Sequence, residues 1–189
     1  MLEPRGWRLR ATATVSLFAL LAWQSLANEP IVLTDGHVAT LADLRRLNAD
    51  QLQQLYASAC PGAQPVGFAR GQVLCRANTR MPRMKTRLSN FIWKGKHFNE
   101  HGEFINQWIA FHAFHSQVAV GPSFYDGRPC LVLEYPENTP YFGKMRDEAR
   151  EVAPGVYLAM VFDRNPPYTF QGFIGFELEA KHKKLSLRR

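Results

Sequence analysis

The chain has 189 residues, of which 46% are hydrophobic, and a formal net charge of +7. This length fits one domain that can bury a real core. The positive charge is compatible with a phosphate-rich partner such as lipid headgroups, but no nucleic-acid-binding motif is present and we expect no nucleic-acid partner.

Residues 1–27 have the pattern of a secretory signal peptide. Arginines at 5, 8 and 10 precede the apolar stretch ATVSLFALLAW, which is shorter than the about 20 residues that cross a bilayer. Ser25 and Ala27 are small residues where a signal peptidase reads the chain, so we expect cleavage after Ala27. An uncleaved N-terminal anchor is the alternative.

Export predicts a periplasmic or secreted protein with no transmembrane segment after cleavage. We expect residues 28–180 to form a single domain. Residues 181–189, KHKKLSLRR, are expected to form a basic tail. A basic tail of this kind is usually solubilising, but peripheral contact with the cell envelope is the other reading.

Two helices are predicted between residues 40 and 59. Thr40 precedes LADLRRL, and Asn48 followed by Gln51 three residues later is typical of a capping box. A third helix is expected to end near Lys94, because apolar residues recur at helical spacing before it. These apolar residues are Met84, Leu88, Phe91 and Ile92.

The rest of the chain has strand patterns separated by tight turns. Strands are expected over 70–77, within 102–120, and over 129–135, 156–162 and 168–180. The fold class is therefore α+β: N-terminal helices plus a curled, mainly antiparallel sheet or half-open β-barrel of about six strands, with an aromatic-lined interior.

The charged segment 143–151 has two interpretations. If it forms one or two helical turns, Arg146 and Arg150 share a face, and Asp147 with Arg150 is an opposite-charge pair. It is then a solvated connection whose surface ion pairs contribute about 0–1 kcal/mol each. Alternatively, one guanidinium points into the barrel mouth and clamps a carboxylate or phosphate.

Glu134 lies in the apolar strand LVLEY. A carboxylate on a buried face needs a partner, or its pKa rises; candidate partners are Arg146, Arg150, Lys94 and Lys96. On an exposed face, Glu134 needs no partner.

WKGKHF places Trp93 and Lys96 around a glycine, either as a binding corner or as a helix end with a core tryptophan. In an oxidising compartment Cys60 and Cys75 are the expected disulfide pair, and Cys130 is expected to be a buried thiol. We expect no metal or other cofactor, because no motif for either is present.

Five motifs occur in order: DQLQQLY, GFARGQ, WKGKHF, YDGRPCLVLEYP and RDEAREVAPGVYL. Together they resemble a family of small, largely uncharacterised bacterial lipocalin-like proteins, over roughly residues 44–162. The resemblance implies a single curled-sheet domain and no established activity. The chain departs from the pattern where Leu-Tyr-Leu-Gly becomes Val156 to Ala159. The motif positions are Trp93, Lys96, Arg146, Asp147, Glu148 and Arg150.

These features predict an exported protein that binds a small ligand. The ligand is expected to be apolar or amphipathic, with an acidic head as one option, held in an aromatic-lined barrel. The candidate ligand-binding residues are Trp93, Lys96, Glu134, Arg146, Arg150 and Tyr157. One alternative is an enzyme of the same fold, with Glu134 or Asp147 as general base beside Lys96 or Arg150. Another is an envelope-associated structural protein without a pocket.

Overall fold

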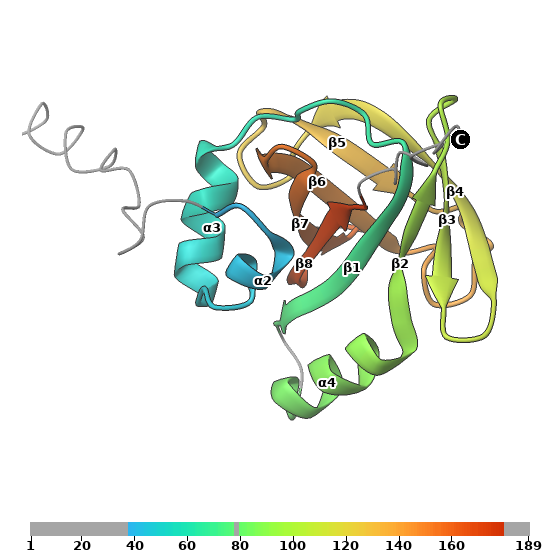
Figure 1. Ribbon diagram of the computed structural model, residues 1–189, viewed down its shortest axis with the longest axis horizontal. Coiled ribbons are helices and arrows are strands. Elements are labelled where there is room, and N and C mark those ends of the chain that lie inside the picture. The colour runs from blue at the N-terminus through green and yellow to red at the C-terminus, as the bar shows by residue number, and fades with distance from the viewer. Residues whose placement is uncertain (1–37, 78–79, 180–189) are drawn as a thin grey trace, which may run out of the picture. The chain divides into compact units, whose positions relative to one another are not determined.

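The computed structural model describes residues 38–77 and 80–179. The predicted signal peptide, 1–27, and the basic tail, 181–189, lie outside the described residues. Eight antiparallel strands form a closed barrel, in which each strand pairs with its sequence neighbours and β1 pairs with β8 (Figure 1). The strands are β1 Gly67–Arg76, β2 Trp93–Phe98, β3 Glu103–Trp108, β4 His112–Pro122, β5 Pro129–Glu134, β6 Met145–Ala153, β7 Val156–Asp163 and β8 Phe170–Leu178.

The expectation of a barrel-like, mainly antiparallel sheet is confirmed, but six strands and a half-open barrel are wrong. WKGKHF is strand β2 rather than a corner, and the single stretch 102–120 is two strands joined by a turn. The charged segment is strand β6, not a helical turn, because its backbone pairs with β5 on one side and with β7 on the other. These additional strands allow the sheet to close on itself.

Helices α2, Leu41–Leu44, and α3, Ala49–Ser58, cover the outer face of the barrel. Both begin with a capping box, as the spacing of Asn48 and Gln51 predicts for α3. Their apolar residues pack against outward-facing side chains of β7 and β8. The members of this outer core include Leu41, Leu44, Leu52, Tyr56, Leu158, Met160, Phe162 and Phe173.

Aromatic rings fill one half of the barrel interior. Phe98 packs against Phe104 and Phe176, with ring centroids 5.6 and 5.7 Å apart, and Tyr157 stacks on Phe176 at 5.1 Å. The Tyr157 hydroxyl donates to the Ala63 carbonyl oxygen at 2.7 Å. This carbonyl belongs to the connection that runs from α3 to β1 across this end of the barrel (Figure 1).

Helix α4, Pro82–Ile92, lies at the other end of the barrel and runs directly into β2 (Figure 1). Its end at Ile92 agrees with the predicted end near Lys94. None of the helices in the described part of the chain is long and apolar enough to cross a membrane.

The predicted disulfide between Cys60 and Cys75 is wrong, because both are free thiols. Cys60 forms an isolated bridge with Glu151 of β6, whereas Cys75 in β1 pairs with Phe173 of β8. Strands β7 and β8 lie between β6 and β1 in the sheet. At about 4.8 Å per strand spacing, the two cysteines are too far apart to be bridged.

Candidate functional site

The half of the barrel that the aromatic rings leave open contains a cavity of about 580 Å³. This volume is within the range of small-molecule sites, so the alternative of a protein without a pocket does not fit the structure. Most of the wall is apolar and includes Val73, Trp93, Trp108, Phe142, Met145, Val161 and Ile174. Leu88 and Ile92 of α4 line the cavity as well, so α4 borders the site.

A cluster of polar side chains lines the cavity: Lys96, Asn106, Tyr135 and Asp147. The Lys96 ammonium donates to the Tyr135 hydroxyl at 2.7 Å and to Asn106 Oδ1 at 3.1 Å. Its Nζ also lies 3.2 Å from Asp147 Oδ2. We call these four residues the barrel cluster.

The ammonium of Lys96 is also surrounded by aromatic rings. Its Nζ lies 4.5 Å from the centroid of Phe104, 5.2 Å from that of Tyr135 and 5.6 Å from that of Trp93. Cation–π attraction and three hydrogen-bonding partners together compensate for the loss of water around the charge. Lys96 therefore sits where the filled half of the barrel meets the cavity.

The sequence around β2 explains how Trp93 and Lys96 both reach the interior. Residues three apart in a regular strand face opposite sides, but the pairing of β2 with β3 shifts register between Trp93 and Gly95. Gly95 has φ +151°, and a Cβ there would lie 2.0 Å from the Ala69 carbonyl oxygen. Gly71 likewise makes room for the Trp93 ring, which a Cβ would meet at 2.5 Å.

The environment fixes the charge states of the barrel cluster. Burial alone lowers the pKa of Lys96, but the interactions with Tyr135 and Asp147 outweigh it and raise the pKa above its ordinary value. Burial also raises the pKa of Tyr135. At neutral pH the site therefore contains an ammonium and a neutral phenol.

The barrel cluster keeps some capacity to bind a ligand. Within it, Tyr135 accepts hydrogen bonds from Lys96 and from Asn106 Nδ2, the latter at 3.0 Å. These contacts use neither the hydroxyl hydrogen of Tyr135 nor Asp147 Oδ1. The indole N–H of Trp108, another lining residue, is buried without an acceptor in the described part of the chain. Buried donors without acceptors are uncommon in folded proteins.

Strand β6 separates the charged residues of the RDEAR motif onto two sides. Asp147 points into the barrel and belongs to the cavity wall. Arg146, Glu148 and Arg150 point outward, toward the connection between β4 and β5. The predicted position of an arginine at the barrel mouth is therefore wrong. Successive residues of a strand point to opposite faces of the sheet, so Arg146 and Arg150 point outward when Asp147 points inward.

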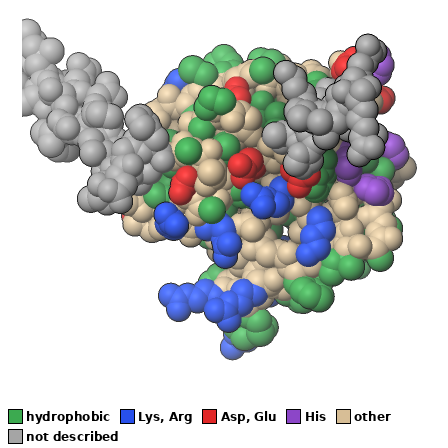
Figure 2. Space-filling view, viewed as in Figure 1, with side chains coloured by type: hydrophobic (Ala, Val, Ile, Leu, Met, Phe, Trp, Pro, Cys, Tyr) green, Lys and Arg blue, Asp and Glu red, His purple; other side chains and the backbone are tan. Residues whose placement is uncertain are grey.

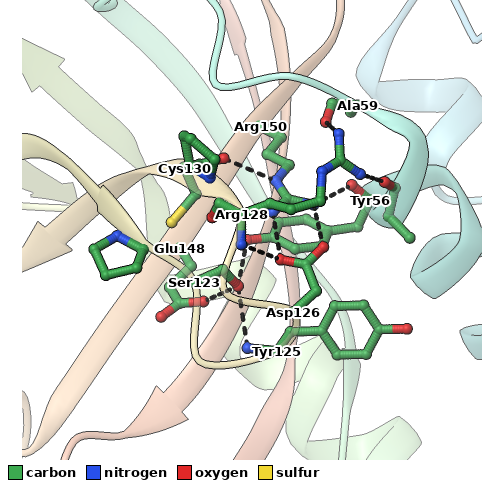
Figure 3. Close-up of polar contacts among 12 residues, drawn as sticks. Tyr56, Ala59, Ser123, Tyr125, Asp126, Arg128, Cys130, Glu148 and Arg150 are labelled. Carbon is green, nitrogen blue, oxygen red and sulfur yellow. Dashed lines mark hydrogen bonds and ion pairs between the residues drawn. The ribbon is translucent and has the colours of Figure 1, made fainter.

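Arg150 is completely buried beneath the β4–β5 connection (Figure 3). Its guanidinium donates to both carboxylate oxygens of Asp126, at 2.7 and 2.8 Å, and to the carbonyl oxygens of Tyr56, Arg128 and Pro129. It also stacks on the Tyr56 ring, 4.4 Å from its centroid. The bidentate pair with Asp126 and the contacts with the carbonyl oxygens attach β6 to α3 and to the β4–β5 connection.

Glu148 holds the same connection from its other side (Figure 3). Its carboxylate accepts hydrogen bonds from the Ser123 hydroxyl at 2.5 Å, the Phe124 N–H at 2.9 Å and Arg146 Nε at 2.7 Å. Arg146 also pairs with Glu134 at 3.0 Å, and the Glu134 side chain is 46% exposed. Glu134 therefore lies on the outer face, which answers the question that its strand pattern leaves open.

The structure brings two of the predicted ligand-binding residues, Trp93 and Lys96, to the cavity wall together with Asp147. Tyr157 lies inside the barrel in the filled half. Tyr135, Asn106 and Trp108 line the cavity but were not predicted. Tyr135 directly follows Glu134 in LVLEY, so its inward position follows from the alternation once Glu134 is placed outside.

Comparison with known proteins supports the fold only. No protein-family profile matches the sequence, and no curated protein matches it. A crystal structure of a protein from Thermomonospora curvata is similar in fold, with a TM-score of 0.52 and 12% sequence identity, covering 73% of this chain and 99% of that one. The structural neighbour supports the barrel, whereas the lipocalin-like family itself stays a prediction.

Proposed function

We propose that this protein binds a small, mostly apolar molecule with a neutral polar head group inside the barrel. The observation that carries the proposal is a cavity of about 580 Å³ with apolar walls and one buried polar cluster. Sites of this kind use their apolar walls for affinity and a few placed polar groups for orientation.

The neutral head follows from the charges of the barrel cluster. Lys96 and Asp147 are paired at 3.2 Å, so their charges largely cancel. An acidic head placed beside them would leave an additional buried negative charge without its own partner. A hydroxyl, amide or carbonyl oxygen can instead accept from the Tyr135 hydroxyl, and a hydroxyl or amide N–H can donate to Oδ1 of Asp147, the oxygen that does not pair with Lys96.

Fluorescent probes that differ in charge test this proposal. Prodan is apolar, neutral and carries a carbonyl, whereas anilinonaphthalene sulfonate is of similar size and anionic. We expect Prodan to bind with a blue-shifted emission and more tightly than the anionic probe. Native mass spectrometry of the gently purified protein should also show a co-purified neutral adduct.

Two matched hydroxyl deletions locate the bound probe. Tyr135→Phe removes the hydroxyl that lines the cavity, and we expect Prodan affinity to fall roughly fivefold to tenfold, as for one lost hydrogen bond. Tyr157→Phe removes a hydroxyl that bonds the Ala63 carbonyl outside the cavity and should leave the affinity unchanged. Equal affinities in the two variants, or no probe binding at all, would contradict the proposal.

An enzyme that uses the same cavity is the second candidate. The proximity of Asp147, Lys96 and Tyr135 favours it, because a carboxylate, an ammonium and a phenol can move protons. Glu134 and Arg150 lie outside the cavity and take no part in this version. If the wild-type protein and an Asp147→Asn variant co-purify with molecules of different mass, the site converts its ligand; if the masses agree, it only binds.

We further propose that binding takes place outside the cytoplasm, on the basis of the signal-peptide pattern in residues 1–27. The test is the N-terminal sequence of the protein from periplasmic and culture fractions. A mature chain that starts at Asn28 supports export, and an intact chain in the cytoplasm contradicts it.

A further inference from the structure

Helix α4 is amphipathic, but its orientation is the reverse of an ordinary surface helix. The polar side chain of Asn90 faces the barrel, where its Oδ1 accepts from the Val73 N–H at 2.6 Å and its Nδ2 donates to the Val73 carbonyl oxygen at 2.9 Å. Ser89 accepts a hydrogen bond from Arg76 of β1 at 2.7 Å. Helix α4 is therefore attached to β1 through polar contacts, and it contains no buried residue.

The apolar side of α4 faces solvent. Met84, Leu88 and Phe91 are 57%, 59% and 67% exposed, although they recur at the spacing of one helical face. A helix usually buries such a face, because transfer of large apolar side chains out of water is favourable. Exposed contiguous apolar surface of this kind marks an interaction site.

The apolar surface extends beyond the helix. The Ile109 N–H donates to the Ile92 carbonyl oxygen at 3.0 Å, which places the β3–β4 turn beside the end of α4. Ile109 and Phe111 of this turn are 52% and 56% exposed. We call Met84, Leu88, Phe91, Ile92, Ile109 and Phe111 the apolar patch.

The charges around the apolar patch have one sign. Every charged residue from Arg76 to Lys96 is a lysine or an arginine. Arg83 and Arg87 lie on α4 and are exposed, and Lys94 lies 5.7 Å over the Phe91 ring. Figure 2 shows Lys and Arg side chains gathered at the α4 end of the molecule, with hydrophobic side chains beside them.

We propose that α4 and the apolar patch dock the protein on an anionic phospholipid surface. An apolar helix face flanked by cations matches the acyl boundary and the negative headgroups of such a surface. A second copy of the chain fits less well, because the same cations would face each other across the interface. Leu88 and Ile92 also line the cavity, so docking would bring the barrel opening to the bilayer.

Vesicle binding by the full chain tests the proposal. We expect co-sedimentation with phosphatidylcholine vesicles that contain phosphatidylglycerol, weaker binding to phosphatidylcholine alone, and a loss of binding as salt rises. Amide hydrogen exchange should slow on binding in residues 82–92 and in the β3–β4 turn. This readout is local, so binding through the segments outside 38–179 does not mimic it.

A pair of surface variants separates the apolar patch from general hydrophobicity. Leu88→Ser with Phe91→Ser should weaken vesicle binding roughly tenfold or more, because two apolar side chains no longer enter the acyl region. Val120→Ser is the matched control: Val120 is also 67% exposed but lies near the far end of β4 from the patch, and its loss should change nothing.

Three results would overturn the proposal. The first is that the double variant binds vesicles as tightly as the wild type, and the second is that α4 gains no protection from hydrogen exchange on vesicles. The third is that the wild type is a dimer that the double variant converts to a monomer, which would assign the apolar patch to contact with a second copy. Docking does not depend on the cavity ligand. A Val161→Phe variant, which narrows the cavity, should lose probe binding and keep vesicle binding.

Discussion

Lys96 of β2 and Asp147 of β6 meet inside the barrel with Nζ 3.2 Å from Oδ2, and their side chains are 1% and 6% exposed. Strands β3, β4 and β5 separate the two strands in the sheet, so the ion pair joins different parts of the barrel wall. Buried ion pairs are often no more stabilising than a hydrophobic replacement. The position of this pair beside the cavity therefore favours a role in binding over a role in stability.

Breaking the Lys96–Asp147 pair from one side should be strongly destabilising. Asp147→Asn leaves the Lys96 ammonium buried without a counter-charge, and we expect a loss of about 3–5 kcal/mol in the free energy of unfolding. Lys96→Met combined with Asp147→Leu should recover most of this loss, because no unpaired charge remains. Urea unfolding followed by tryptophan fluorescence measures the stability of both variants and of the wild type.

The matched control for this pair is Arg46→Ala. Arg46 pairs with Asp43 at 3.6 Å, but its side chain is 81% exposed, so its removal should cost less than about 1 kcal/mol. A cost of Asp147→Asn no greater than that of Arg46→Ala would show that the barrel pair is hydrated rather than buried.

Arg150 should behave as a structural residue, despite its place in the charged motif. Arg150→Lys keeps the charge but loses the bidentate contact with Asp126, and we expect the free energy of unfolding to fall by about 2–4 kcal/mol. Arg70→Lys, on an exposed arginine that pairs with Glu177, should cost much less. The affinity of the folded Arg150→Lys variant for Prodan should equal that of the wild type. A weaker affinity would contradict this prediction and indicate that Arg150 contributes to ligand binding.

Acid should weaken the attachment of the β4–β5 connection. The hydrogen bonds from Arg150 are the largest cause that lowers the pKa of Asp126. The unfolded chain therefore takes up a proton at Asp126 at a higher pH than the folded chain does. Its contribution to stability is present above about pH 4 and is lost as the pH falls further. In Asp126→Asn, urea midpoints between pH 5 and pH 3 should fall less steeply than in the wild type; identical slopes would contradict this.

High pH should act on the barrel cluster. The pKa values of Tyr135 and Lys96 are both raised, so the folded chain keeps protons that the unfolded chain releases. Stability from these groups is complete below about pH 10 and is lost as the pH rises above it. Melting temperatures measured from pH 8 to pH 11 should fall less in Tyr135→Phe than in the wild type. Tyr141→Phe, at a tyrosine that is 92% exposed, should follow the wild-type curve.

Sequence patterns correctly predicted the helices and strands that are determined by residues close together in the chain. The capping residues Asn48 and Gln51 located α3, and alternation of apolar residues located most strands. Strand β6 was misread because its charged residues look solvated. They are buried by partners distant in sequence, such as Asp126, 24 residues before Arg150, and no local pattern shows such a contact.

The candidate site was only partly predictable for the same reason. Trp93 and Lys96 stood out as an aromatic and a cation around a glycine, but their partners come from other strands. Asn106, 10 residues after Lys96, lies opposite it in the pairing of β2 with β3. Tyr135 lies 39 residues after Lys96 and reaches it only because the sheet curls into a barrel. The solvent-facing orientation of α4 was equally hidden, since helical spacing shows that a face is apolar and not which way it points.

The free thiols offer a last prediction, which also tests the absence of the disulfide. Cys60 is exposed, whereas burial raises the pKa of Cys130 to about 11. At pH 8 only about one in a thousand Cys130 side chains is then a thiolate, the form that reacts. We therefore expect iodoacetamide to modify Cys60 first, half-buried Cys75 more slowly and Cys130 last, as read by peptide mass spectrometry. After unfolding in urea without reductant all three should react; a Cys60–Cys75 disulfide in that sample would contradict the strand order of the barrel, because β7 and β8 lie between the two sites.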